Sequence, residues 1–238
     1  MRARAVIALG LLCALAGCQE SGFDEARETQ RPLKVQHAMN MLEGTKVPGV
    51  AERPMTLDAA ALGDTLALGV EPVRAALPGG RPPAYLSEQA RGVEIVPPLT
   101  ELDLAAAEAA EPDLILGTKE LDGKFYEQLS RIAPTVMTDG QNWKLNLRLH
   151  GEALGRTNDA ERLLTDWDNR VARVRDQLRR SGRSIEVGPG SAPFAEQVVI
   201  DLQGGDESTR ASLVWGTGWD GGGILAARAA LEDIAGRL

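Results

Sequence analysis

The chain has 238 residues, of which 43% are hydrophobic and 25% charged, which is enough for one large or two modest globular domains. Its formal net charge of −8 argues against nucleic acid as a partner. Both cysteines, Cys13 and Cys18, lie near the N-terminus, so we expect the folded part to depend on a hydrophobic core and not on disulfides.

The first residues have the layout of a bacterial secretory signal. A short basic start precedes an apolar stretch at residues 5–16, which is too short to span a bilayer that takes about 20 apolar residues. Residues 15–18 read Leu-Ala-Gly-Cys and resemble the lipobox, in which the chain is cut before the cysteine and the sulfur is lipidated. We therefore expect a signal peptide at residues 1–17, lipidation of Cys18 and a polar tether at residues 18–34. The alternative is an ordinary secretory signal or a signal anchor with an incidental cysteine.

Short apolar runs alternate with helical periods from Arg53 onward, and this alternation predicts an α/β fold. The apolar run "DLILG" at residues 113–117 is typical of a strand buried on both faces in a parallel sheet. We assign residues 35–157 to an N-terminal α/β lobe. The expected strands lie at residues 53–57, 70–77, 92–97, 113–117 and 135–138, and the expected helices at residues 58–68, 101–111 and 125–132.

A long helix is predicted next, over residues 158–181. Asn158 and Glu161 have the spacing of a capping box at its start. At 1.5 Å per residue this helix would be about 36 Å long, and we expect it to join two lobes. Residues 182–238 then leave room for only a reduced C-terminal lobe. Its expected elements are strands at residues 184–188 and 197–203 and a helix at residues 224–238.

The sequence shows no pattern of residues for catalysis or for a protein-built metal site. The two histidines, His37 and His150, have no partner at metal-ligand spacing. His150 falls on the apolar face of a helix predicted to end at Gly155, so we expect it to be a core or boundary side chain. Motifs for a nucleophilic serine or a phosphate-binding loop are missing from the sequence. We therefore predict no enzyme, no catalytic residue, no metal ligand and no cofactor.

Several stretches together resemble the ferric-siderophore substrate-binding lipoproteins of ABC importers. The similarity is densest at residues 111–164, which include "YEQLSRIAPTV", "NWKLNL" and "GEALG". "HAMNMLEGTKVP" at residues 37–48, "ALGDTLALGVEPV" at residues 61–73 and "GGGILAARAALEDI" at residues 221–234 fit the same family. The resemblance implies a two-lobed periplasmic-binding-protein fold with one long connecting helix. Its N-terminal lobe would be complete and its C-terminal lobe truncated.

The resemblance also implies a function. The chain would bind a ferric siderophore, a citrate-type or hydroxamate-type chelate, and deliver it to the permease of an ABC importer for iron uptake. It would work as a lipid-anchored monomer at the cell envelope, facing the periplasm or the outside. A binding protein for cobalamin or haem, and a degenerate envelope lipoprotein without a transport role, are the alternatives.

Ligand-binding candidates follow from the same comparison. Lys119 and Thr118 come directly after the "DLILG" strand, and ligands of open α/β sheets bind at the carboxyl ends of strands. The further candidates are a cation and aromatic side chains that could wall a cleft. They are Arg81, Tyr85, Trp143 and Trp219.

The chain departs from the family pattern at its permease-docking position. Relatives carry a glutamate there that is thought to contact arginines of the permease, whereas this chain has Ala105. Either Glu101, Asp103 or Glu108 replaces that glutamate, or docking to the permease is weakened.

Overall fold

The computed structural model describes residues 31–99, 104–182, 185–187, 198, 201–202, 211–213 and 222–236. The expected signal peptide, the lipidation site Cys18 and most of the expected tether therefore lie outside the described residues. Strand β1 (Leu33–His37) includes the last two residues assigned to that tether. Among the described residues, no helix is both long enough and apolar enough to cross a lipid bilayer.

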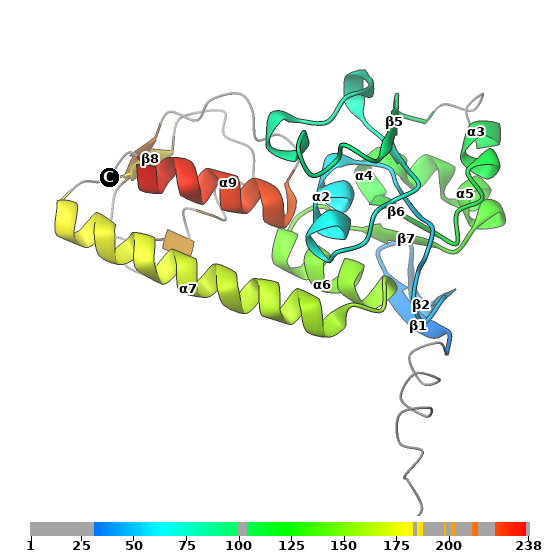
Figure 1. Cartoon of the computed structure of the whole chain (residues 1–238). Helices are drawn as coiled ribbons and strands as arrows, with labels where there is room; N and C mark the ends of the chain where they lie inside the picture. The colour runs from blue at the N-terminus through cyan, green and yellow to red at the C-terminus, as the bar shows by residue number, and fades with distance from the viewer. Residues whose placement is uncertain are drawn as a thin grey trace, which may run out of the picture.

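A parallel sheet forms the centre of the fold (Figure 1). Its strand order is β5-β4-β3-β6-β7, so the chain moves outward in one direction from β3 and then in the other from β6. This arrangement confirms the predicted α/β fold, and each strand lies within one residue of an expected range. The strands are β3 (Pro54–Thr56), β4 (Arg74–Ala76), β5 (Glu94–Val96), β6 (Leu114–Thr118) and β7 (Thr135–Thr138).

Helices cover both faces of the sheet because strand side chains alternate between the faces. In β6, Leu114 and Leu116 join one buried cluster, whereas Ile115 joins another. Helices α2 (Ala59–Ala67) and α6 (Trp143–Ala153) supply the first cluster, and α3 (Leu104–Ala109) and α5 (Tyr126–Ile132) the second. Short helical turns complete the connections: η1 (Pro78–Gly80), η2 (Ala84–Leu86), α4 (Lys119–Asp122) and η4 (Gly123–Phe125).

Helix α7 (Thr157–Ser181) is continuous, as predicted, and extends away from the sheet beside α9 (Gly223–Gly236) (Figure 1). The helix before it ends at Ala153, and Gly155 takes the left-handed conformation with φ = 69°, which confirms the predicted stop. The predicted capping box is wrong. Helix α7 begins one residue earlier, with Arg156 at the N-cap, and no side chain caps it.

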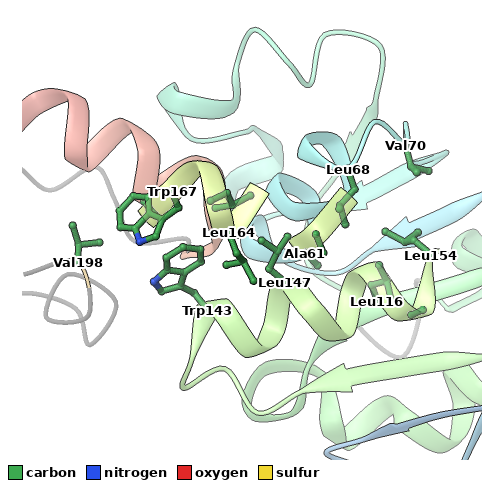
Figure 2. Close-up of a cluster of buried hydrophobic side chains, with 14 of the residues drawn as sticks. Ala61, Leu68, Val70, Leu116, Trp143, Leu147, Leu154, Leu164, Trp167 and Val198 are labelled. Atoms are coloured by element: carbon green, nitrogen blue, oxygen red, sulfur yellow. The ribbon is translucent and has the colours of Figure 1, made fainter. Parts of the chain in front are cut away.

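Two tryptophans pack between the first turn of α6 and the middle of α7 (Figure 2). The rings of Trp143 and Trp167 meet edge to face, with centroids 5.1 Å apart and planes at 83°. Trp167 is completely buried, and its Nε1–H donates a hydrogen bond of 2.9 Å to Asp201. This pair anchors the long helix to the sheet lobe.

The described C-terminal segments pair two strands, β8 (Ile185–Val187) and β9 (Ala211–Leu213), in parallel. Strand β8 confirms the first strand predicted after α7. The second, at residues 197–203, is wrong at the residues that the structure describes, because Val198, Asp201 and Leu202 are helical. Val198 and Leu202 are buried one helical turn apart, so the apolar run follows a helical period and not an alternating one.

A buried carboxylate joins three helices. Asp64 of α2 accepts a 2.8 Å hydrogen bond from His150 Nδ1 of α6 and a 2.9 Å hydrogen bond from the backbone N–H of Ile224 in α9. Asp64 is 0% exposed and His150 is 1% exposed. The predicted core position of His150 is therefore confirmed.

The N-terminal hairpin covers one edge of the sheet. Strand β1 pairs antiparallel with β2 (Asn40–Val47), and Ala38 N–H donates to the carbonyl of Met137 in β7. His37, the last residue of β1, is buried, and its Nδ1 accepts the backbone N–H groups of Met137 and Met39 at 3.2 and 3.3 Å. Its Nε2 therefore carries the ring hydrogen and donates to Thr45 Oγ1 at 2.8 Å. Burial lowers the pKa of His37 from 6.5 to about 4.

The burial of His37 predicts a loss of stability in acid. An unfolded chain protonates this ring below pH 6.5, whereas the folded protein resists protonation down to about pH 4. The stability that the neutral ring contributes is therefore present above pH 6.5 and lost as the pH falls towards 4. We expect this loss to be about 2–3 kcal/mol. Urea unfolding of the wild type and of His37→Gln at both pH values measures it. Between pH 6.5 and pH 4, the free energy of unfolding should fall by about 2–3 kcal/mol less in the variant than in the wild type. Equal falls in the two proteins would show that His37 does not cause the loss.

Candidate functional site

A pocket of about 470 Å³ lies at the carboxyl edge of the parallel sheet. Parallel strands bring their carboxyl ends to one edge, and ligands bind there where the strand order reverses. Here the reversal falls between β3 and β6. Every strand of this sheet contributes to the lining: Leu57 and Asp58 after β3, Pro78 after β4, Pro98 and Leu99 after β5, Thr118 at the end of β6, and Gly140 and Gln141 after β7.

Three polar side chains meet at the β3–β6 reversal. Thr118 Oγ1 donates a 2.9 Å hydrogen bond to Asp58 Oδ2, and Thr118 N–H makes a long 3.5 Å hydrogen bond to Asp122 Oδ2. The other oxygen of Asp58 accepts the N–H of Ala61 at 2.8 Å and so caps helix α2. The fold therefore engages both oxygens of Asp58, whereas Asp122 is held only loosely by its described neighbours.

The carboxyl group of Asp122 has an unusual proton affinity. Burial, followed by the negative charge of Asp58, raises its pKa from 3.8 to about 7. The N–H of Thr118 and the ammonium group of Lys124 oppose this rise only in part. Asp122 is therefore near half-protonated at neutral pH, and it becomes a carboxylate acceptor above that pH.

The walls of the pocket are largely apolar. Phe125 and Trp143 are buried aromatic residues of the lining, and Leu121 is an exposed apolar one. The ammonium group of Lys124 lies 4.7 Å from the centroid of the Phe125 ring. Gly222 and Gly223 at the start of α9 complete the lining. An apolar pocket with a few polar groups can hold an organic ligand of moderate size.

The structure brings two of the sequence-predicted site residues, Thr118 and Trp143, into this lining. Lys119 is exposed at the start of α4, beside the pocket but outside its lining. Arg81 is exposed on the loop after β4, and Tyr85 packs against a separate buried cluster. Trp219 lies outside the described residues.

The docking candidates occupy the segment before and within α3. Glu108 is exposed on α3, as is Ala105. Glu101 and Asp103 lie outside the described residues.

Sequence reasoning missed the polar groups that distinguish this pocket. Asp58 was expected only as the first residue of the helix at residues 58–68, and Asp122, Lys124 and Asn146 were not expected to take part. Asp122 could have been found from the helical spacing after β6. Leu121, Asp122 and Phe125 lie three, four and seven positions beyond Thr118, on one face of a helix, and all three line the pocket. Among the described residues, no group of three or more His, Cys, Asp or Glu side chains could hold a metal ion.

The sequence and the fold of this chain are similar to those of known proteins. Residues 94–189 match the sequence profile of the family described as periplasmic binding protein. A probable siderophore-binding lipoprotein of Bacillus subtilis, YfiY, is 32% identical over 170 residues, which are 69% of this chain and 52% of YfiY. The achromobactin-binding periplasmic protein of Dickeya dadantii is 32% identical over 132 residues, which are 54% of this chain and 43% of that protein. The chain spans about half the length of the curated relatives it matches.

Solved structures of binding proteins share this fold. Staphylococcus aureus SirA in complex with staphyloferrin B aligns with a TM-score of 0.56 and 32% identity, covering 63% of this chain and 51% of SirA. The petrobactin-binding protein YclQ of Bacillus subtilis aligns with a TM-score of 0.57 at 22% identity, covering 77% of this chain and 70% of YclQ, and supports the fold alone. The resemblance to siderophore-binding proteins that the sequence indicated is therefore confirmed.

Proposed function

We propose that this chain binds a ferric siderophore in the pocket at the carboxyl edge of the sheet and delivers it to an ABC importer. The observation that carries the proposal is a pocket built from the ends of all five strands of the parallel sheet. It occurs in a chain that is 32% identical over 170 residues to a probable siderophore-binding lipoprotein. Its volume lies within the range of about 300–1,000 Å³ that small-molecule sites occupy. Since the described residues offer no metal-ion cluster, iron would arrive already held by its chelator.

Membrane anchoring belongs to the same proposal. Lipidation of Cys18 would tether the folded domain as a monomer at the envelope surface, because acyl chains hold a protein through buried CH₂ groups. The exposed Glu108 on α3, with Glu101 and Asp103, supplies carboxylates that could contact the permease.

Tryptophan fluorescence tests the ligand class, because Trp143 lines the pocket. The ligands to compare are a ferric trihydroxamate, ferric citrate, haem and cobalamin, with N-acetyltryptophanamide as the control for light absorption by the ligand. We expect saturable quenching by at least one ferric chelate. Quenching only by haem or cobalamin would support the alternative ligands, and the lack of any saturable quenching would refute the proposal.

A matched pair of variants tests the location of the site. Leu121 lines the pocket at 62% exposure, whereas Leu145 is 56% exposed on α6 and lies outside the lining. Leu121→Ser should weaken chelate binding by about tenfold, as expected for the loss of about 1.5 kcal/mol of apolar contact. Leu145→Ser should leave the dissociation constant unchanged. Equal effects of the two substitutions would place the ligand elsewhere.

A further inference from the structure

The charge of the described pocket lining is unusual for a site that would take an anion. Asp58 and Asp122 are carboxyl groups of the lining, at 6% and 7% exposure, whereas Lys124 is exposed. Within the described lining, Lys124 is the single cation and no arginine is present. With both carboxyl groups ionised, these three side chains sum to −1.

The two carboxyl groups differ in their capacity to meet a ligand. Both oxygens of Asp58 already accept hydrogen bonds, from Ala61 N–H and from Thr118 Oγ1. Asp122 accepts one long hydrogen bond at Oδ2 from the described residues, and Oδ1 has no hydrogen-bond partner among them. Asp122 is therefore the carboxyl group with free acceptor capacity at the pocket.

We propose that Asp122 selects the charge of the chelate, so that the pocket favours a neutral or cationic ferric complex that presents an N–H or ammonium donor and disfavours a polyanionic one. This inference rests on the proposed function. Three singly charged hydroxamates neutralise ferric iron, whereas three doubly charged catecholates leave a strongly anionic complex. A hydroxamate with a free amine matches the Asp122 carboxylate, and a tricatecholate places like charge against it.

The position of Asp122 makes this selection effective. Charges at a partly buried site interact more strongly than charges in bulk water, since less solvent separates them. An incoming polyanion also meets Asp58, whose charge already contributes to keeping the proton on Asp122. Binding an anion would therefore require Asp122 to take up a proton or to stay unpaired beside it. A cation or an N–H donor would instead satisfy the open oxygen.

Binding of three ferric complexes tests the inference: cationic ferrioxamine B, uncharged ferrichrome and anionic ferric enterobactin. The titrations are run about one pH unit above the pKa of Asp122, where its carboxyl group is about nine-tenths ionised. The wild type should bind the cationic complex at least about tenfold more tightly than the anionic one. Asp122→Asn, which keeps the shape and removes the charge, should reduce that preference by about tenfold.

Two further variants separate the possible outcomes. Glu120→Gln neutralises an exposed carboxyl group on the same short helix outside the lining, and it should change the preference less than about twofold. Lys124→Met removes the exposed cation of the lining and should increase the preference for the cationic complex, which keeps the test open if Asp122→Asn folds poorly. Equal affinity of the wild type for all three complexes would overturn the inference. So would a preference that stays unchanged in both Asp122→Asn and Lys124→Met. Either result would leave the proposed function intact. Binding of none of the three complexes would overturn the inference, and the proposed function would fall with it only if ferric citrate did not bind either.

Discussion

Replacing Asp64 with alanine is expected to lower the free energy of unfolding by about 4 kcal/mol. The substitution removes the carboxylate that accepts hydrogen bonds from two buried donors, His150 Nδ1–H and the N–H of Ile224. Each buried donor left without a partner costs about 1–3 kcal/mol. Because these groups come from α2, α6 and α9, the loss should also loosen the contact of the C-terminal helix with the sheet lobe. His150 Nε2 is buried without a described partner, so the bond to Asp64 is the hydrogen bond that the described residues give this ring.

Urea unfolding followed by circular dichroism measures this effect. Asp64→Asn keeps one acceptor oxygen and should lose less stability than Asp64→Ala. Asp176→Ala, at an exposed position on α7, is the control and should change stability by less than about 0.5 kcal/mol. A loss below about 1 kcal/mol in Asp64→Ala would show that this hydrogen-bond network does not hold the three helices together.

Trp167→Ala should have an effect of similar size, about 3–5 kcal/mol. Trp167 is fully buried against Trp143, and its removal leaves a large cavity where α7 meets α6 (Figure 2). The edge-to-face contact with Trp143 and the hydrogen bond to Asp201 are lost together with the packing.

Thermal and urea unfolding of Trp167→Ala and Trp167→Phe separate the contribution of the aromatic packing from that of the hydrogen bond to Asp201. The phenylalanine variant keeps an aromatic ring but loses the N–H donor, so it should lose about 1–2 kcal/mol. If Trp167→Ala unfolded at the same urea concentration as the wild type, α7 would have to be held mainly by other contacts.

The helices and strands could be predicted where their apolar residues follow a clear pattern along the sequence. The continuous apolar run of β6 indicated a strand buried on both faces, and residues 158–181 repeated their apolar positions every three or four residues. Short apolar segments are ambiguous, since a few apolar residues fit either period. The run around Val198 and Leu202, expected as a strand, is helical for that reason.

The pocket could be located from the sequence, but its chemistry could not. Thr118 was predicted because the carboxyl end of β6 fixes its place. A helical turn begins directly after Thr118, so the next residue, Lys119, is exposed outside the lining. The residues that line the pocket follow at helical spacing: Leu121, Asp122 and Phe125. The proton affinity of Asp122 depends on burial and on Asp58, which is 64 positions earlier in the numbering, so no local pattern reveals it.

Paramagnetic broadening in NMR spectra tests the central claim most directly, namely that a ferric chelate occupies the pocket at the carboxyl edge of the sheet. Amide signals are compared between the protein with a ferric trihydroxamate and the protein with the matching gallium complex, which has the same shape but is diamagnetic. We expect iron to broaden the signals of Thr118, Gly140 and Gly222. The signal of Asp176 on α7, which extends away from the sheet (Figure 1), should persist. Broadening centred away from these residues, or spectra that are identical for the two metals, would contradict the account.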